Sequence, residues 1–231
     1  MPTTPRARAR AQTMNDIVRI GREHLATQGA AALSLRAVAR DLGVVSSAVY
    51  RYVGSRDELL TLLVVDGYNA LGDAVDAALA ENPGDPIEQL RVLGRTVRHW
   101  ALAEPARYGL LFGTPVPGYH APEQTMDPGI RVITAMLVLF ARAHELGLLR
   151  APSAQPRVSA PLATSFARIR DEFQLDLPDW LLVRGATFWP SLFGAVSADV
   201  FDMYGQNSFA DRDELFDHQL DALLDMLGYR P

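Results

Sequence analysis

The residues best suited to chemistry lie between Ser34 and Leu59, and their types favour recognition rather than catalysis. A predicted short helix begins at Ser46 and carries small or hydrogen-bonding side chains on its outer face, among them Ser47 and Arg51. Side chains of this kind on a short exposed helix can enter a DNA major groove and bond to base edges. The segment therefore predicts a surface that reads duplex DNA.

Two short helices joined by a tight turn would position these side chains. The first is expected from Ser34 to Gly43 and the second over residues 46–52, a spacing typical of a helix-turn-helix. Gly43 permits the turn between them. The pair needs apolar inner faces in order to pack at a steep angle, and the sequence supplies Leu35, Val38, Ala39, Leu42, Val44 and Val49.

Helices with capping signals flank this segment. Upstream, a helix is expected over residues 13–28, opened by a capping pair of Thr13 and Asp16. Downstream, a capping box begins a long helix over residues 55–81. The upstream helix and the helix-turn-helix together form a predicted three-helix domain.

The rest of the chain is also patterned for helices. Apolar residues recur at helical spacing, and prolines and glycines interrupt the pattern over residues 82–86, 113–128 and 150–161. Pro190 lies inside a long predicted helix and predicts a bend there. The sequence therefore predicts an all-α fold of nine or ten helices, with an N-terminal helix-turn-helix domain and a C-terminal helical bundle.

Residues 13–60 resemble the DNA-binding domain of TetR-type transcriptional regulators. The first helix fits, and the matching positions after it are Leu35, Val38, Ala39, Leu42, Gly43, Val44, Ala48, Val49, Tyr50, Arg51, Tyr52, Ser55, Arg56, Asp57, Glu58 and Leu59. Further along, Trp189, Phe193 and Gly194 resemble the Trp-His-Gly signature of one C-terminal subgroup, with Phe193 at the place of the usual histidine.

The resemblance implies a set of contacts with DNA. Tyr50 and Tyr52 would touch the DNA backbone, and Arg56 would touch a phosphate. Arg56 lies in the first turn of a helix, where a cation opposes the helix dipole, so a nearby phosphate would offset its charge. Val45 replaces the hydroxyl residue of many relatives and can contact a thymine methyl group. The alternatives are packing roles for both tyrosines and a solvated charge for Arg56. The full predicted set is Arg36, Val45, Ser46, Ser47, Tyr50, Arg51, Tyr52 and Arg56.

The resemblance also implies that residues 61–231 bind a ligand and form a dimer. Their helices would surround a pocket for a small apolar or amphipathic effector, and the last two helices would pair with their copies as a four-helix bundle. One alternative is that the residues expected around the pocket form an ordinary hydrophobic core. The other is that the apolar stripes of the last two helices pack within one chain. The residues expected to line the pocket are Trp100, Tyr108, Phe112, Met136, Phe140, His144, Phe166, Phe173, Trp180, Phe188 and Trp189.

Charge is divided unevenly along the chain. Residues 1–60 hold nine arginines and five acidic residues, a net of +4, whereas residues 61–231 carry a net of −9. A small basic region joined to a larger acidic one is typical of a nucleic-acid reader with a second module. Residues 1–12 are expected to form a flexible arm whose three arginines follow a minor groove or phosphates, or else a solubilising tail.

Several function classes are disfavoured by what the sequence lacks. It contains no Cys and no Lys, which removes disulfides, thiolate metal sites and lysine catalysis. The five histidines have no metal-ligand spacing, and no hydrolase or dinucleotide-enzyme motif occurs. No membrane span or signal peptide is expected. We therefore expect no enzyme, cofactor or metal site, and a cytoplasmic location.

Together these patterns predict a DNA-binding transcriptional regulator. A homodimer would present two recognition helices, about 34–36 Å apart, to a pseudo-palindromic operator. Occupancy of the operator would block polymerase, so repression is the expected sign. The alternative is a helical adaptor or small-molecule-binding protein that no longer binds DNA.

Overall fold

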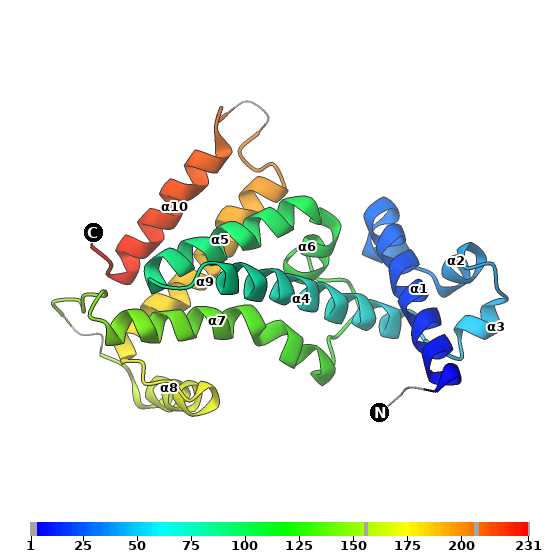
Figure 1. The fold of residues 1–231 in the computed structure, drawn as a ribbon, viewed down its shortest axis with the longest axis horizontal. Coiled ribbons are helices and arrows are strands. Elements are labelled where there is room, and N and C mark those ends of the chain that lie inside the picture. The colour runs from blue at the N-terminus through cyan, green and yellow to red at the C-terminus, as the bar shows by residue number, and fades with distance from the viewer. Residues whose placement is uncertain (1–3, 155–156, 206–207, 231) are drawn as a thin grey trace. The chain divides into compact units, whose positions relative to one another are not determined.

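The computed structural model describes residues 4–154, 157–205 and 208–230, and it confirms the all-α prediction (Figure 1). Within these ranges, none of the helices is both long and apolar enough to cross a bilayer. In chain order the elements are α1 (Pro5–Gln28), the 3₁₀ turn η1 (Ala30–Ala32), α2 (Leu35–Asp41), α3 (Ser46–Val49), α4 (Arg56–Glu81), α5 (Pro86–Ala103), α6 (Pro105–Phe112), the 3₁₀ turn η2 (Glu123–Thr125), α7 (Met126–Glu145), α8 (Ala160–Phe173), α9 (Asp179–Val200) and α10 (Arg212–Leu227).

The chain forms two compact units. The first contains Met1–Ala70 and Glu104–Gly129, and the second contains Leu71–Ala103 and Ile130–Pro231. Helix α4 therefore begins in the first unit and ends in the second. The division differs from a boundary at residue 60, because α6 and the loop after it pack with the N-terminal helices.

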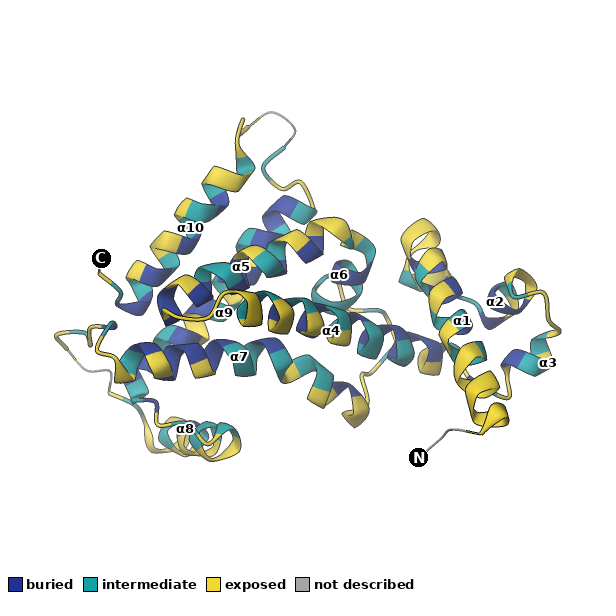
Figure 2. Cartoon of the chain, viewed as in Figure 1, coloured by how far each residue is buried: buried dark blue, intermediate teal, exposed yellow. Residues whose placement is uncertain are grey.

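The core of the first unit joins α1, α2, α3 and the start of α4. Its buried side chains include Ile17, Val38, Val49 and Leu59. Buried positions alternate with exposed ones along these helices (Figure 2). Most of the predicted inner face of the helix-turn-helix is buried as expected. Val44 is the exception, because it lies in the turn and is 41% exposed.

The core of the second unit is built from α5, α9 and α10, with α7 and α8 packed beside them. A Cβ atom at Gly94 would lie 2.6 Å from Leu220 Cδ2, so glycine lets α5 and α10 approach closely. Phe140 of α7 meets Phe188 of α9 edge to face at 5.3 Å between ring centroids. Helix α9 continues through Pro190 without interruption, and the predicted bend there stays a prediction.

Two helix starts have side-chain caps, and the first of them is the capping box predicted for the helix over residues 55–81. Ser55 Oγ accepts a hydrogen bond from the Glu58 N–H at 3.1 Å, and Glu58 Oε2 accepts one from the Gly54 N–H at 2.6 Å. At the start of α10, Asp211 Oδ1 accepts from the Glu214 N–H at 2.9 Å. These bonds satisfy N–H groups that a helix end otherwise leaves without partners.

The start of α1 differs from the prediction. The helix begins at Pro5, where Thr4 Oγ1 accepts a hydrogen bond from the Ala7 N–H at 3.2 Å, so the predicted cap at Thr13 is wrong. Thr13 lies inside the helix, and its hydroxyl donates to the Ala9 carbonyl. Residues 5–12 of the predicted flexible arm are helical instead, while residues 1–3 of that arm lie outside the described part of the chain.

A hydrogen bond between a buried histidine and an exposed carboxylate ties α1 to α2. His24 Nε2 lies 2.6 Å from Asp41 Oδ2, and the His24 side chain is buried. The hydrogen bond from His24, together with one from Arg40, holds the pKa of the Asp41 carboxyl below its ordinary value of 3.8. The ionised carboxylate therefore stabilises the folded first unit above pH 3.8, and this contribution is lost as the pH falls through the lowered pKa.

We expect Asp41→Asn to lower the free energy of unfolding at neutral pH, since it removes the charge but keeps the shape. The difference from wild type should shrink below about pH 3.8, where the wild-type carboxyl also becomes neutral. Urea denaturation at a series of pH values measures this. Stability curves for the two proteins that stay parallel through the acid range would contradict the prediction.

Candidate nucleic-acid interface

The structure places a short exposed helix, α3, beside α2 in the arrangement of a helix-turn-helix. Gly43 has a φ of +72°, in the left-handed region that favours glycine, and it turns the chain between the two helices. Val45 occupies the N-cap position of α3 with an extended backbone. Val49 is buried under α3, which fixes the opposite edge of the helix toward solvent.

The predicted DNA-contacting residues gather on that solvent edge and near it. Val45 and Tyr50 are 70% and 47% exposed, and the side chains of Ser47, Arg51 and Arg36 are also exposed. Ser46 and Tyr52 are half-buried. A packing role accounts for Tyr52, which lies against the apolar core, but it does not account for Tyr50.

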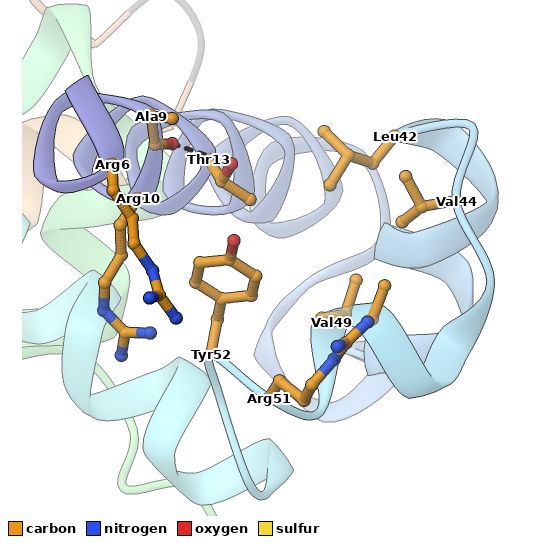
Figure 3. Close-up of a pocket in the computed structure, with 10 residues that line it drawn as sticks. Arg6, Ala9, Arg10, Thr13, Leu42, Val44, Val49, Arg51 and Tyr52 are labelled. Carbon is orange, nitrogen blue, oxygen red and sulfur yellow. Dashed lines mark hydrogen bonds between the residues drawn. The ribbon is translucent and has the colours of Figure 1, made fainter.

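A groove of about 470 Å³ lies between the N-terminal turns of α1 and the end of α3 (Figure 3). Arg6, Arg10, Arg51 and Tyr52 contribute its polar lining, and the rest of the lining is small or apolar. Arg10 Cζ lies 5.1 Å from the centroid of the Tyr52 ring, within the range of a cation–π contact. Sequence reasoning missed this groove, because it treated residues 1–12 as separate from the helix-turn-helix.

Arg56 has partners within the chain. Its Nη2 donates to the Ala30 carbonyl at 2.9 Å and to the Ala31 carbonyl at 3.3 Å, so it holds the 3₁₀ turn η1 against the start of α4. Its side chain is 35% exposed. The guanidinium thus has a structural role that the sequence did not suggest, and its contact with phosphate stays a prediction.

A second arginine cluster links α6 with the N-terminal helices. Arg107 is buried, and its Nη2 donates to Asp66 Oδ2 at 2.8 Å and to the Asp66 carbonyl at 3.0 Å. Arg22 of α1 approaches the same carboxylate at 3.8 Å. Asp66 of α4 therefore connects one helix of the three-helix domain to α6. These residues are far apart in sequence, and no local spacing signals the cluster.

The predicted effector-pocket residues are divided between the two units. Tyr108 and Phe112 lie in the first unit, where their ring centroids are 5.2 Å apart. The predicted liners of the second unit that are buried are Trp100, Met136, Phe140, Phe166, Trp180 and Phe188, whereas His144, Phe173 and Trp189 are half-buried.

One polar atom stands out among these residues. His144 Nδ1 is buried and has no hydrogen-bond partner, and the His144 ring meets that of Trp180 nearly edge to face at 5.7 Å. Among the described residues nothing satisfies this nitrogen, so His144 has a free polar atom inside the second unit.

The last two helices share a shallow groove of about 340 Å³. Ser191, Gly194 and Ala195 of α9 line it, together with Gln219, Ala222 and Leu223 of α10 and with Tyr204 from the segment between the two helices. Gly194 is exposed, and a Cβ atom added there would meet nothing within 4 Å. The α9 side of the groove is therefore lined by small residues and is open to a second protein chain.

Two family profiles match the chain. The profile of the bacterial regulatory proteins of the tetR family matches residues 13–63, and that of the tetracyclin repressor-like C-terminal domain matches residues 90–223. The first match covers the helix-turn-helix and the start of α4. The second covers most of α5 through α10.

Whole-chain relatives agree with these profiles. The HTH-type transcriptional regulators Rv1816 of Mycobacterium tuberculosis and Mb1846 of Mycobacterium bovis are each 43% identical over 223 residues, which is 95% of this chain and 94% of theirs. The solved structure of SCO4313, described as a regulatory protein, has a TM-score of 0.76 at 32% identity and covers 96% of this chain and 100% of its own.

A more distant structure supports the fold alone. The TetR family transcriptional regulator PfmR from Thermus thermophilus has a TM-score of 0.58 at 17% identity, over 90% of this chain and 97% of its own. With an exposed α3 on a buried three-helix core, and with relatives that match from the N-terminal helices to α10, the chain belongs to the TetR family and is a DNA-binding transcriptional regulator.

Proposed function

We propose that the protein is a ligand-responsive repressor that binds a pseudo-palindromic operator as a homodimer, on chromosomal DNA in the cytoplasm. The observation that carries the proposal is the edge of α3, where Val45, Ser47 and Tyr50 are exposed while Val49 anchors the helix from below. A helix kept as a mere scaffold would have no reason to leave this edge uncovered. The adaptor alternative is therefore the weaker one.

The DNA contacts would be shared between base edges and the backbone. Ser46, Ser47 and Arg36 would approach base edges, and Val45 would meet a thymine methyl group. Tyr50, Arg51, Tyr52 and Arg56 would contact the backbone, with the guanidinium of Arg56 using N–H groups not engaged by Ala30 and Ala31.

The homodimer would form through α9 and α10. A glycine in the middle of a helix costs about 1 kcal/mol relative to alanine, and Gly194 has no neighbour within its own chain that requires it. Close approach of a second copy to the groove of Gly194, Ala195 and Ala222 would explain why position 194 is a glycine.

The effector would be a small amphipathic molecule held among the aromatic side chains of α7 and α9. Its apolar part would contact Phe140 and Phe188, and its polar group would bond to His144 Nδ1, which has no partner in the structure. In this proposal the site binds the effector and releases it unchanged, so the protein would not be an enzyme.

Two features would couple effector and DNA. Helix α4 belongs to both units, and Asp66 on that helix holds Arg107 of α6 and lies near Arg22 of α1. A shift of α6 or α4 on effector binding would therefore reach the recognition helices. Such coupling is reciprocal, so DNA must also weaken effector binding.

The proposal is tested with the purified protein and the DNA upstream of its own gene. Gel-shift analysis should give one complex containing two protein chains. Compounds that raise the melting temperature of the protein should release it from this DNA. A protein that binds the fragment but that no stabilising compound releases would overturn the ligand-responsive part, and a protein that binds no upstream fragment would overturn the whole.

A further inference from the structure

We propose that Arg6 and Arg10, on the first turns of α1, join Arg51 in binding a phosphate of the DNA backbone beside the recognition helix. The three arginines line one groove of about 470 Å³, with Arg6 and Arg10 on one side of the Tyr52 ring and Arg51 on the other (Figure 3). Arg6 and Arg10 are one helical turn apart, so they extend from the same face of α1. The proposal rests on the proposed insertion of α3 into the major groove.

The groove selects an anion. In the described part of the chain, no carboxylate lies within 4.0 Å of Arg6, Arg10 or Arg51, and none of the residues lining the groove is acidic. Elsewhere arginines pair closely with aspartates, such as Arg95 with Asp217 at 2.7 Å. These three arginines therefore have no carboxylate partner, although the chain contains more acidic than basic residues.

The helix itself gives a second argument. Residues 5–12 are exposed, so burial of apolar surface does not explain why they continue α1. Arginines near a helix N-terminus oppose the helix dipole, and no acidic residue lies in this first turn. A phosphate in the groove would offset both the dipole and the mutual repulsion of the three cations.

Tyr52 fixes one of these cations in place. The contact of Arg10 with the Tyr52 ring holds the guanidinium over the groove, while Tyr52 is itself held against the core. Because the long side chain of Arg10 is already oriented, binding loses less conformational entropy. Tyr52 is thus a positioning residue for Arg10, in addition to any contact that it makes with DNA.

Arg8 provides a matched control, because residues 5–12 are helical and Arg8 does not share the lining position that the arm expected from the sequence gave to all three of its arginines. It lies on the same exposed segment and carries the same charge, but it does not line the groove. The variants Arg6→Ala, Arg10→Ala and Arg8→Ala would be compared by fluorescence anisotropy over a range of salt concentrations. The probes are the upstream fragment and a duplex of unrelated sequence, and circular dichroism checks that the helix content is kept.

We expect Arg6→Ala and Arg10→Ala to bind both duplexes about tenfold more weakly and to lower the slope of log K against log salt by about 0.9 per contact. Arg8→Ala should stay within about twofold of wild type. Equal effects of all three substitutions would overturn the proposal. It would also be overturned if Arg6→Ala and Arg10→Ala left the salt slopes unchanged, even if the groove of the wild-type protein bound inorganic phosphate. Failure of the wild-type protein to bind either duplex would instead overturn the operator proposal on which this one rests.

Discussion

Ser47→Glu is expected to weaken operator binding by about 100-fold or more and to leave the fold intact. Ser47 is exposed on α3, and no hydrogen bond involves its side chain in the described structure. A carboxylate in the first turn of a helix is compatible with the helix dipole, so α3 should still form. In the complex the same carboxylate would face the phosphates that border the major groove, and like charges repel strongly there.

Ser47→Ala is the matched control for this prediction. It removes one hydroxyl group, so it should alter sequence preference at the base pair concerned and cost only about 1 kcal/mol, roughly fivefold in affinity. Affinity is measured by gel shift on the upstream fragment, and folding by the melting temperature. A Ser47→Glu protein that binds this fragment as tightly as wild type would show that α3 does not enter the groove.

Gly194→Arg is expected to convert the protein to a monomer and to weaken operator binding by about 100-fold to 10,000-fold, because two linked half-site contacts become one. A Cβ atom added at Gly194 would meet no described residue of its own chain within 4 Å. Helix propensity alone would make the monomer about 1 kcal/mol more stable. The large side chain would, however, fill the groove through which a second copy must approach.

Ala80→Arg is the control for Gly194→Arg. It adds the same charge at an exposed helical position that does not line the α9–α10 groove, so the protein should remain dimeric. Sedimentation velocity gives the oligomeric state, and anisotropy gives the affinity. A Gly194→Arg protein that sediments as a dimer would place the interface elsewhere.

Many of the helices could be predicted from local sequence signals, namely the spacing of apolar residues and the residues that cap helix ends. The helix-turn-helix could be predicted because Leu35, Val38 and Val49 recur at helical spacing around a glycine turn, and all three are buried. The start of α4 could be predicted because its capping box is a purely local set of hydrogen bonds. Such elements depend on interactions between residues close together in sequence, and a sequence pattern can therefore predict them.

What could not be predicted depends on neighbours in space. The segment before Thr13 carries no apolar stripe, so its periodicity gave no helix, although Thr4 followed by Pro5 is itself a helix-start signal. The groove of Arg10 and Tyr52 exists only once α1 is extended toward α3. The Asp66 cluster joins three helices and leaves no trace in any local spacing.

The roles of single arginines show the same limit. Arg56 was predicted from its position to meet phosphate, but its carbonyl partners at Ala30 and Ala31 come from a 3₁₀ turn that no pattern indicated. A cation's charge can be read from a sequence, whereas the partner that meets it depends on the tertiary fold.

Hydroxyl-radical footprinting of the DNA upstream of the gene tests the central claim most directly. Two α3 helices in one dimer should protect two segments whose centres lie about 34–36 Å apart along the duplex, and Ser47→Glu should remove both. A wild-type protein that protects no segment of this DNA, or only a single one as a lone subunit, would contradict the account.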